Sequence, residues 1–287
     1  MLTRSRDVAQ APAAGLARLL ADPTFEVIPL AQALERVAVL SRGAMVTVTA
    51  SPAKGIEATV ELAVELEASG VRAIPHLSAR MVRDRTHLAA ILDRLEGAGI
   101  DRLFVVGGDS HEPGAFGDGL ALLREMADMG RLPADVGIPC YPQGHPIIPD
   151  DALARALVDK APLATYMTSQ LCFDPRAVAA FLARTRSAGI ELPVRLGIPG
   201  VAEIPKLLSI SARIGVRDAS KFVTRNARFV GQLLRSGGVY RPTRLVRDLA
   251  PVIDDPTANV VGLHLYTFNN VAATEAWRRA AEDEARR

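Results

Sequence analysis

Cysteine is scarce in this sequence, and long apolar runs are absent. The 287 residues include two cysteines, Cys140 and Cys172, which stand far apart and form no Cys-x-x-Cys motif. This spacing supports neither a zinc site nor a disulfide framework, so we interpret both residues as buried thiols. No apolar run approaches the roughly 18 residues of a membrane-spanning helix, so we expect a cytoplasmic protein that does not enter a membrane.

The sequence also lacks an excess of either positive or negative charge. The 34 Lys and Arg residues nearly balance the 32 Asp and Glu residues, and the net charge of +2 argues against a dedicated nucleic-acid binder. Neither a G-x-G-x-x-G turn nor a G-x-x-x-x-G-K-[ST] loop is present, which argues against a Rossmann dinucleotide site and a P-loop. With 49% hydrophobic residues, the chain can nevertheless bury a sizeable core.

Short runs rich in Val, Ile and Leu alternate with amphipathic stretches along nearly the whole chain. This alternation is typical of βα units, and eight such units in fewer than 300 residues favour a closed barrel over an open sheet. The sequence therefore predicts an α/β fold, a (β/α)₈ TIM barrel over residues 1–287 as one catalytic domain. The predicted strands are Thr24–Leu30, Ala44–Ala50, Val71–Leu77, Arg102–Gly108, Asp135–Tyr141, Ala164–Gln170, Pro193–Gly200 and Val260–Asn269.

Helix signals lie between these strands. Gly70, Gly99 and Gly189 each follow an apolar-periodic stretch, where a left-handed residue ends a helix. Asp174 before Pro175 predicts a helix N-terminus. The predicted helices are Ile56–Ala68, Thr86–Glu96, Phe116–Met129, Asp151–Lys160, Pro175–Ser187 and a final helix from Val271 to Arg287.

One interval is longer than the others. Val201–Asn259, between the seventh and eighth strands, has room for extra helices besides the seventh helix of the barrel. Within it, Val201–Arg247 holds ten Lys and Arg residues against two acids. This surplus indicates either a basic rim that attracts phosphates or carboxylates, or a solvated helical face or subunit contact. A homo-oligomer is therefore left open.

Polar side chains gather at the predicted strand ends. In a barrel the carboxyl ends of the strands converge on one mouth, where the chemistry takes place. Each polar residue taken alone could be structural, but together they favour a functional site. The residues are Glu26, Thr49, His76, Asp109, Tyr141, His145, Gln170, His264 and Tyr266.

Two chemistries could use such a mouth. His76, Asp109, His145 and His264 are suitable metal ligands, but the first strand lacks the His-x-His pair that opens many barrel metallohydrolases. We therefore predict no metal site. An organic cofactor is the other option, because a barrel can bind flavin at its mouth without a Rossmann turn.

Several of these strand ends resemble a known family. VRAIPHLSAR (71–80) and GIDRLFVVGGD (99–109) are similar to the third and fourth strands of methylenetetrahydrofolate reductases, which read like PHLTC and GI(D)-x-x-LxLRGD. YPQGHP (141–146), TSQLCFD (168–174) and HLYTFN (264–269) resemble the family's YPExHP, ITQxFFD and HFYTxN, in the same order. Phe25, Glu26 and Pro29 resemble its FExxPP entry.

The resemblance implies a barrel that carries FAD, with NAD(P)H and a tetrahydrofolate derivative using the same face in turn. By the family pattern, Glu26 is the general acid and Asp109 stabilises a cationic iminium. Gln170 and Tyr266 would bind the substrate. The residues that the resemblance assigns to the cofactor are Thr49, His76, Gly108, Asp109, Tyr141, His145 and Lys160.

The sequence also departs from the family pattern. Gly107 stands where the family has an arginine that would contact the flavin. The alternatives are therefore a flavin-independent reductase that takes hydride directly from NAD(P)H, or an enzyme that runs in the oxidative direction. A metal-dependent hydrolase or lyase and a pterin-binding methyl carrier also stay open.

Overall fold

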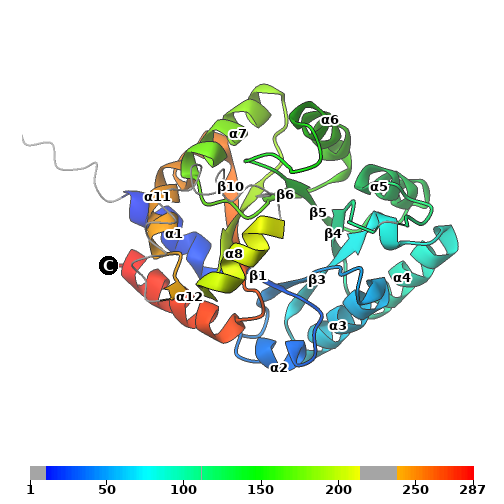
Figure 1. Ribbon diagram of the computed structural model, residues 1–287, viewed down its shortest axis with the longest axis horizontal. Helices are drawn as coiled ribbons and strands as arrows, with labels where there is room; N and C mark the ends of the chain where they lie inside the picture. Colours follow the sequence, from blue (N-terminus) through cyan, green and yellow to red (C-terminus); the bar gives the residue numbers. More distant parts are fainter. Residues whose placement is uncertain (1–10, 111, 214–237) are drawn as a thin grey trace, which may run out of the picture.

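The computed structural model describes residues 11–110, 112–213 and 238–287. Its centre is a closed barrel of parallel strands in the order β1-β10-β7-β6-β5-β4-β3-β2 (Figure 1). All eight predicted strands are confirmed, and the fold is a (β/α)₈ TIM barrel. The strands are β1 (Thr24–Val27), β2 (Met45–Val48), β3 (Arg72–Ser78), β4 (Arg102–Val106), β5 (Asp135–Cys140), β6 (Tyr166–Ser169), β7 (Val194–Pro199) and β10 (Val260–Tyr266).

Helices surround this barrel (Figure 1). The predicted helices are confirmed, but α5 begins three residues late because Asp118 caps it and accepts a hydrogen bond from Ala121 N at 2.9 Å. Helices α1 and α2 were not predicted. The helices of the ring are α1 (Ala11–Ala21), α2 (Ala33–Val37), α3 (Gly55–Ser69), α4 (Arg85–Gly97), α5 (Gly119–Asp128), α6 (Asp150–Lys160), α7 (Pro175–Ser187), α11 (Thr243–Ile253) and α12 (Val271–Ala285).

The predicted helix ends are confirmed by backbone geometry. Gly70, Gly99 and Gly189 have φ values of +96°, +76° and +78°, the left-handed conformation that glycine adopts without strain. Asp174 accepts a hydrogen bond from Arg176 N at 2.9 Å and begins α7. None of the helices within the described ranges has the length and apolar composition that crossing a bilayer requires.

The long interval adds a small substructure after β7. A two-stranded antiparallel sheet, β8 (Ala202–Glu203) with β9 (Val239–Tyr240), accompanies helix α8 (Ile204–Arg213). Five of the ten cations, within 214–237, lie outside the described residues. Arg244 pairs with Asp248 at 3.7 Å and Arg247 pairs with Glu284, so these two cations belong to a helical face.

Two apolar layers position the site. The larger layer fills the space between the barrel and the helices, and it buries the thiols of Cys140 and Cys172 as predicted. The smaller layer lies inside the barrel and contains Met45, Phe104 and Tyr166. Because strand residues alternate between the two sides of a barrel wall, one strand supplies both layers.

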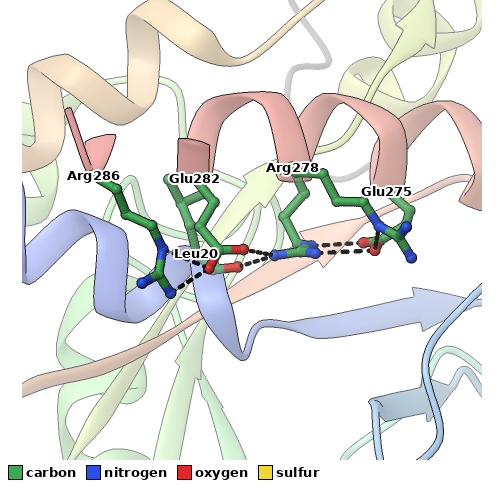
Figure 2. Close-up of polar contacts among 6 residues, drawn as sticks. Leu20, Glu275, Arg278, Glu282 and Arg286 are labelled. Atoms are coloured by element: carbon green, nitrogen blue, oxygen red, sulfur yellow. Dashed lines mark hydrogen bonds and ion pairs between the residues drawn. The ribbon is translucent and has the colours of Figure 1, made fainter. Parts of the chain in front are cut away.

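An ion-pair network joins the last helix to the first. Arg278 on α12 donates to Glu275 at 2.6 Å, to Glu282 at 2.6 Å and to the carbonyl of Leu20 on α1 at 2.7 Å (Figure 2). Arg286 also contacts Glu282 at 2.6 Å. Since α1 leads directly into β1, this network anchors the start of the first strand.

Candidate active site

A cavity of about 490 Å³ opens at the carboxyl ends of the strands. Its volume lies within the range of small-molecule sites. Ile210 of α8 contributes to its lining, so the inserted helix forms part of its wall. Eight of the nine polar residues predicted at the strand ends line this cavity together: Glu26, Thr49, His76, Asp109, Tyr141, Gln170, His264 and Tyr266.

Glu26 projects into the cavity from β1, between two histidines. Its Oε2 atom lies 3.2 Å from His264 Nε2 and 4.0 Å from His76 Nε2. The Glu26 side chain is 15% exposed, whereas those of His264 and His76 are 2% and 9% exposed. The carboxyl group is therefore the member of this trio that a ligand can reach.

His76 is held as a neutral ring. Burial lowers its pKa to about 4, although Glu26 opposes this shift, and nearby His264 adds to it. The ring packs on Phe104 with centroids 4.7 Å apart. Its buried Nε2 has no hydrogen-bond partner among the described residues.

The residues after β10 fix the end of β1. Thr267 Oγ1 donates to the backbone carbonyl of Glu26 at 2.6 Å. Asn269 Oδ1 accepts from Ile28 N at 2.7 Å, and Asn269 Nδ2 donates to Ile28 O at 3.0 Å. Phe268 and Asn269 have φ values of +51° and +62°, a strained conformation that clusters at functional sites. These side-chain bonds replace the longer strands predicted for β1 and β10.

Asp109 lies exposed at the rim of the cavity beyond β4. The turn that presents it needs Gly108, which has φ +89°, and an added Cβ there would lie 1.8 Å from Ser78 Oγ. Gly108 does not line the cavity among the residues named for it. Its position is therefore explained by backbone conformation and close packing.

Gln170 and Tyr266 line the cavity at the ends of β6 and β10. Tyr266 Oη donates to Ser169 O at 3.1 Å, and Gln170 Oε1 accepts from Leu171 N at 2.8 Å. Gly197 makes room for this arrangement, because a Cβ there would lie 2.1 Å from Ser169 O and 2.8 Å from the Tyr266 ring. Burial raises the pKa of Tyr266 well above its ordinary value, so its hydroxyl stays protonated.

Two predicted cofactor residues lie away from this cavity. Lys160 ends α6 and faces a separate cavity of about 650 Å³ between α6 and α7. Burial lowers its pKa, and Asp118 acts against that shift. His145 packs edge-on against Tyr141, with centroids 5.3 Å apart, and its Nδ1 accepts from Ile147 N at 3.3 Å. Tyr141 borders both cavities.

The cavity has an acidic character. Among its described lining residues are two carboxyl groups, those of Glu26 and Asp109, and no Lys or Arg. Such a site favours a ligand that develops positive charge. The described residues contain no group of three or more His, Cys, Asp or Glu side chains that could hold a metal ion.

The sequence analysis assigned no role to three residues of this site. His264 was noted as a polar strand end and a suitable metal ligand but was given no role, and Thr267 and Asn269 entered only as letters of the HLYTFN motif. Their contacts with β1 link positions more than 230 residues apart. The signal that could have found them is the closure of the barrel, which places the last strand beside the first.

A comparison with known families identifies the family of this chain. The family model for methylenetetrahydrofolate reductase matches residues 25–280, nearly the whole chain. The chain belongs to the methylenetetrahydrofolate reductase family. The family makes it a folate-related oxidoreductase, and the matched range contains all the predicted site residues.

Solved structures of other proteins are similar to this chain, and one of them agrees on the fold. A plant class V chitinase mutant from Cycas revoluta has a TM-score of 0.50 and 8% identity, covering 91% of this chain and 99% of that chain. A candidate lyase/mutase from Burkholderia cenocepacia J2315 has a TM-score of 0.47 and 14% identity, covering 95% of this chain and 85% of that chain. At such identities the likeness to the chitinase concerns the barrel alone.

Proposed function

We propose that this protein interconverts 5,10-methylenetetrahydrofolate and 5-methyltetrahydrofolate, using FAD and NAD(P)H. The observation that carries the proposal is the convergence of Glu26, Asp109 and Gln170 from three strands on one cavity. In the reductive direction the bond from the bridging carbon to N10 breaks. N10 then takes a proton, and hydride reaches the carbon that stays on N5.

Each residue has a defined part in this proposal. Glu26 donates the proton to N10, because its carboxyl is the one reachable acid among the buried groups of the barrel wall. Asp109 stabilises the positive charge that forms at N5 when the ring opens. Gln170 and Tyr266 hold the pterin ring, whose edge presents the donors and acceptors that an amide and a hydroxyl can pair with.

The cavity suits the ring of a flavin better than its phosphates. Apolar side chains such as Phe104, Val106 and Leu171 line it beside polar groups, as a planar heterocycle requires. Thr49, His76, Asp109 and Tyr141 would hold FAD there, and FAD when bound supplies the hydride. With no cation among the described lining residues, the pyrophosphate would lie outside the cavity, and Gly108, His145 and Lys160 stay predictions for that part.

That same lack of a cation, with Gly107 in place of the family arginine, favours a second candidate. In a flavin-independent reductase, the nicotinamide of NAD(P)H would occupy the ring site and pass hydride directly to folate. Visible absorbance of the purified protein, after incubation with FAD and removal of unbound FAD, distinguishes the two. Flavin bands that bleach with NADH support the flavin enzyme. A colourless protein that oxidises NAD(P)H only with methylenetetrahydrofolate supports the direct transfer.

A further inference from the structure

The two histidines beside Glu26 both approach the same oxygen of its carboxyl group. His264 Nε2 lies 3.2 Å from Oε2, and His76 Nε2 lies 4.0 Å from that atom. Among the described residues, none forms a hydrogen bond with Oε1. One carboxyl oxygen therefore faces the barrel wall, and the other is left for a ligand.

Of the two histidines, His264 alone is within hydrogen-bond distance of the carboxyl. A distance of 3.2 Å allows a hydrogen bond, and 4.0 Å does not. The His264 ring is 2% exposed and packs edge-on against Tyr266, with centroids 4.8 Å apart. Packing thus fixes the ring, and the fixed ring can orient the carboxyl.

We propose that His264 is a positioning residue that donates a hydrogen bond from Nε2 to Glu26 Oε2 and so leaves the transferable proton on Oε1. The inference rests on the proposed function, because it concerns the proton that Glu26 delivers. In the step, the Oε1–H bond breaks and the N10–H bond forms, while His264 keeps its own proton. The hydrogen bond to Oε2 then becomes charge-assisted and stabilises the carboxylate.

The opposite tautomer would defeat this role. If Nε2 of His264 lacked a proton, Glu26 would donate from Oε2 to the ring, and its proton would be held against the barrel wall. His76 does not replace His264, because its Nε2 lies too far from Oε2 for a hydrogen bond.

The other ionisable groups around Glu26 have separate tasks. Arg195 on β7 donates to Thr24 Oγ1 at 2.6 Å and lies over the Tyr166 ring. The remaining groups are the phenols of Tyr141 and Tyr266, which burial keeps protonated, and Asp109 at the rim. The orientation of the Glu26 carboxyl therefore depends on His264.

Two substitutions of His264 test the positioning role. H264Q keeps an N–H donor near the place of Nε2, whereas H264L removes it. We expect H264L to lower kcat for folate reduction by about tenfold to a hundredfold with little change in KM, and H264Q to retain most of the rate. An equal loss in both variants, or a loss confined to KM, would overturn the proposal.

His87 provides a matched control. Its Nε2 lies 3.1 Å from Glu57 Oε1, so it forms a similar His–Glu pair between α3 and α4, outside the barrel. We expect H87L to leave kcat for folate reduction unchanged. A fall in kcat equal to that of H264L would mean that losing any such pair disturbs the rate, and this would overturn a specific role for His264.

Nitrogen NMR of the ring tests the tautomer without any folate and without a variant that must fold. In the wild-type protein we expect the His264 ring to carry a proton on Nε2. A proton on Nδ1 in a protein that reduces folate would overturn the positioning role alone. A proton on Nε2 in a protein that reduces no folate with any electron donor would overturn the proposed function instead.

Discussion

The side-chain amide of Asn269 pairs with both backbone polar groups of Ile28, at 2.7 Å to the N–H and 3.0 Å to the carbonyl. The amide thus continues the hydrogen bonding between β1 and β10 beyond the residues where the two strands end. Because Ile28 is two residues from Glu26, this pair sets the direction in which β1 presents its carboxyl group.

Replacing Asn269 tests this pairing. N269G removes both hydrogen bonds and keeps a residue that adopts φ +62° freely, whereas N269A adds left-handed strain. We expect urea unfolding to give a loss of about 1–3 kcal/mol for N269G and about 1 kcal/mol more for N269A. Unchanged stability in both variants would mean that the pairing does not hold the end of β1.

Glu26 is expected to act in one half-reaction only. E26Q keeps the size of the side chain but removes the acidic proton. We therefore expect reduction of the cofactor by NAD(P)H to stay nearly intact while folate reduction falls by about 10²–10⁴-fold. Rapid-mixing absorbance measures the two steps separately, and an equal loss in both would contradict the acid role.

Asp109 is expected to act through its charge. D109N keeps the hydrogen-bonding shape but removes the negative charge that stabilises the cation at N5. We expect the rate of folate reduction to fall by about 10²–10³-fold while folate affinity changes little, since the charge forms only as the ring opens. A main effect on folate affinity, seen in equilibrium binding, would assign Asp109 to ground-state binding instead.

His76 should make stability depend on pH. Its pKa is lowered from 6.5 to about 4, so the unfolded chain binds the proton more readily between these values. The contribution of the neutral His76 ring to the free energy of unfolding is fully present above about pH 6.5. It is lost as the pH falls toward 4, to a total of about 3 kcal/mol. Urea unfolding at pH 7 and pH 4.5 should show a smaller loss in H76Q than in wild type. Equal losses would contradict a buried neutral ring.

Arg278 is expected to serve stability and not chemistry. R278M removes the cation that Glu275 and Glu282 share. Each acid keeps a second arginine, so we expect a loss of about 2 kcal/mol in urea unfolding. R155A breaks an exposed pair with Asp151 and should cost less than about 1 kcal/mol. A similar small loss in both variants would mean that the network in Figure 2 does not anchor α1.

The barrel was predictable because each strand leaves its own local signal. Val and Ile runs, the glycines at helix ends and the Asp174 cap are short-range features, and the structure confirms them. The shared mouth was predictable for a related reason. Glu26, Asp109 and Gln170 each end a parallel strand, and such ends converge once a barrel is assumed.

Contacts set by closure of the barrel were not predictable in this way. The bond from His264 to Glu26 depends on the register in which Thr24 lies beside His264. No short-range sequence pattern indicates which residue of β10 lies beside which residue of β1. Lys160 illustrates a second limit, because no local pattern indicates that it lines a different cavity from Glu26.

Product analysis tests the central claim most directly. The purified protein would be incubated with 5,10-methylenetetrahydrofolate, FAD and NAD(P)H, and the folates separated by chromatography, with E26Q in parallel. The account predicts 5-methyltetrahydrofolate from the wild-type protein and at least a hundredfold less from E26Q. Absence of this product from the wild-type protein with and without FAD, and in the reverse direction with an electron acceptor, would contradict it.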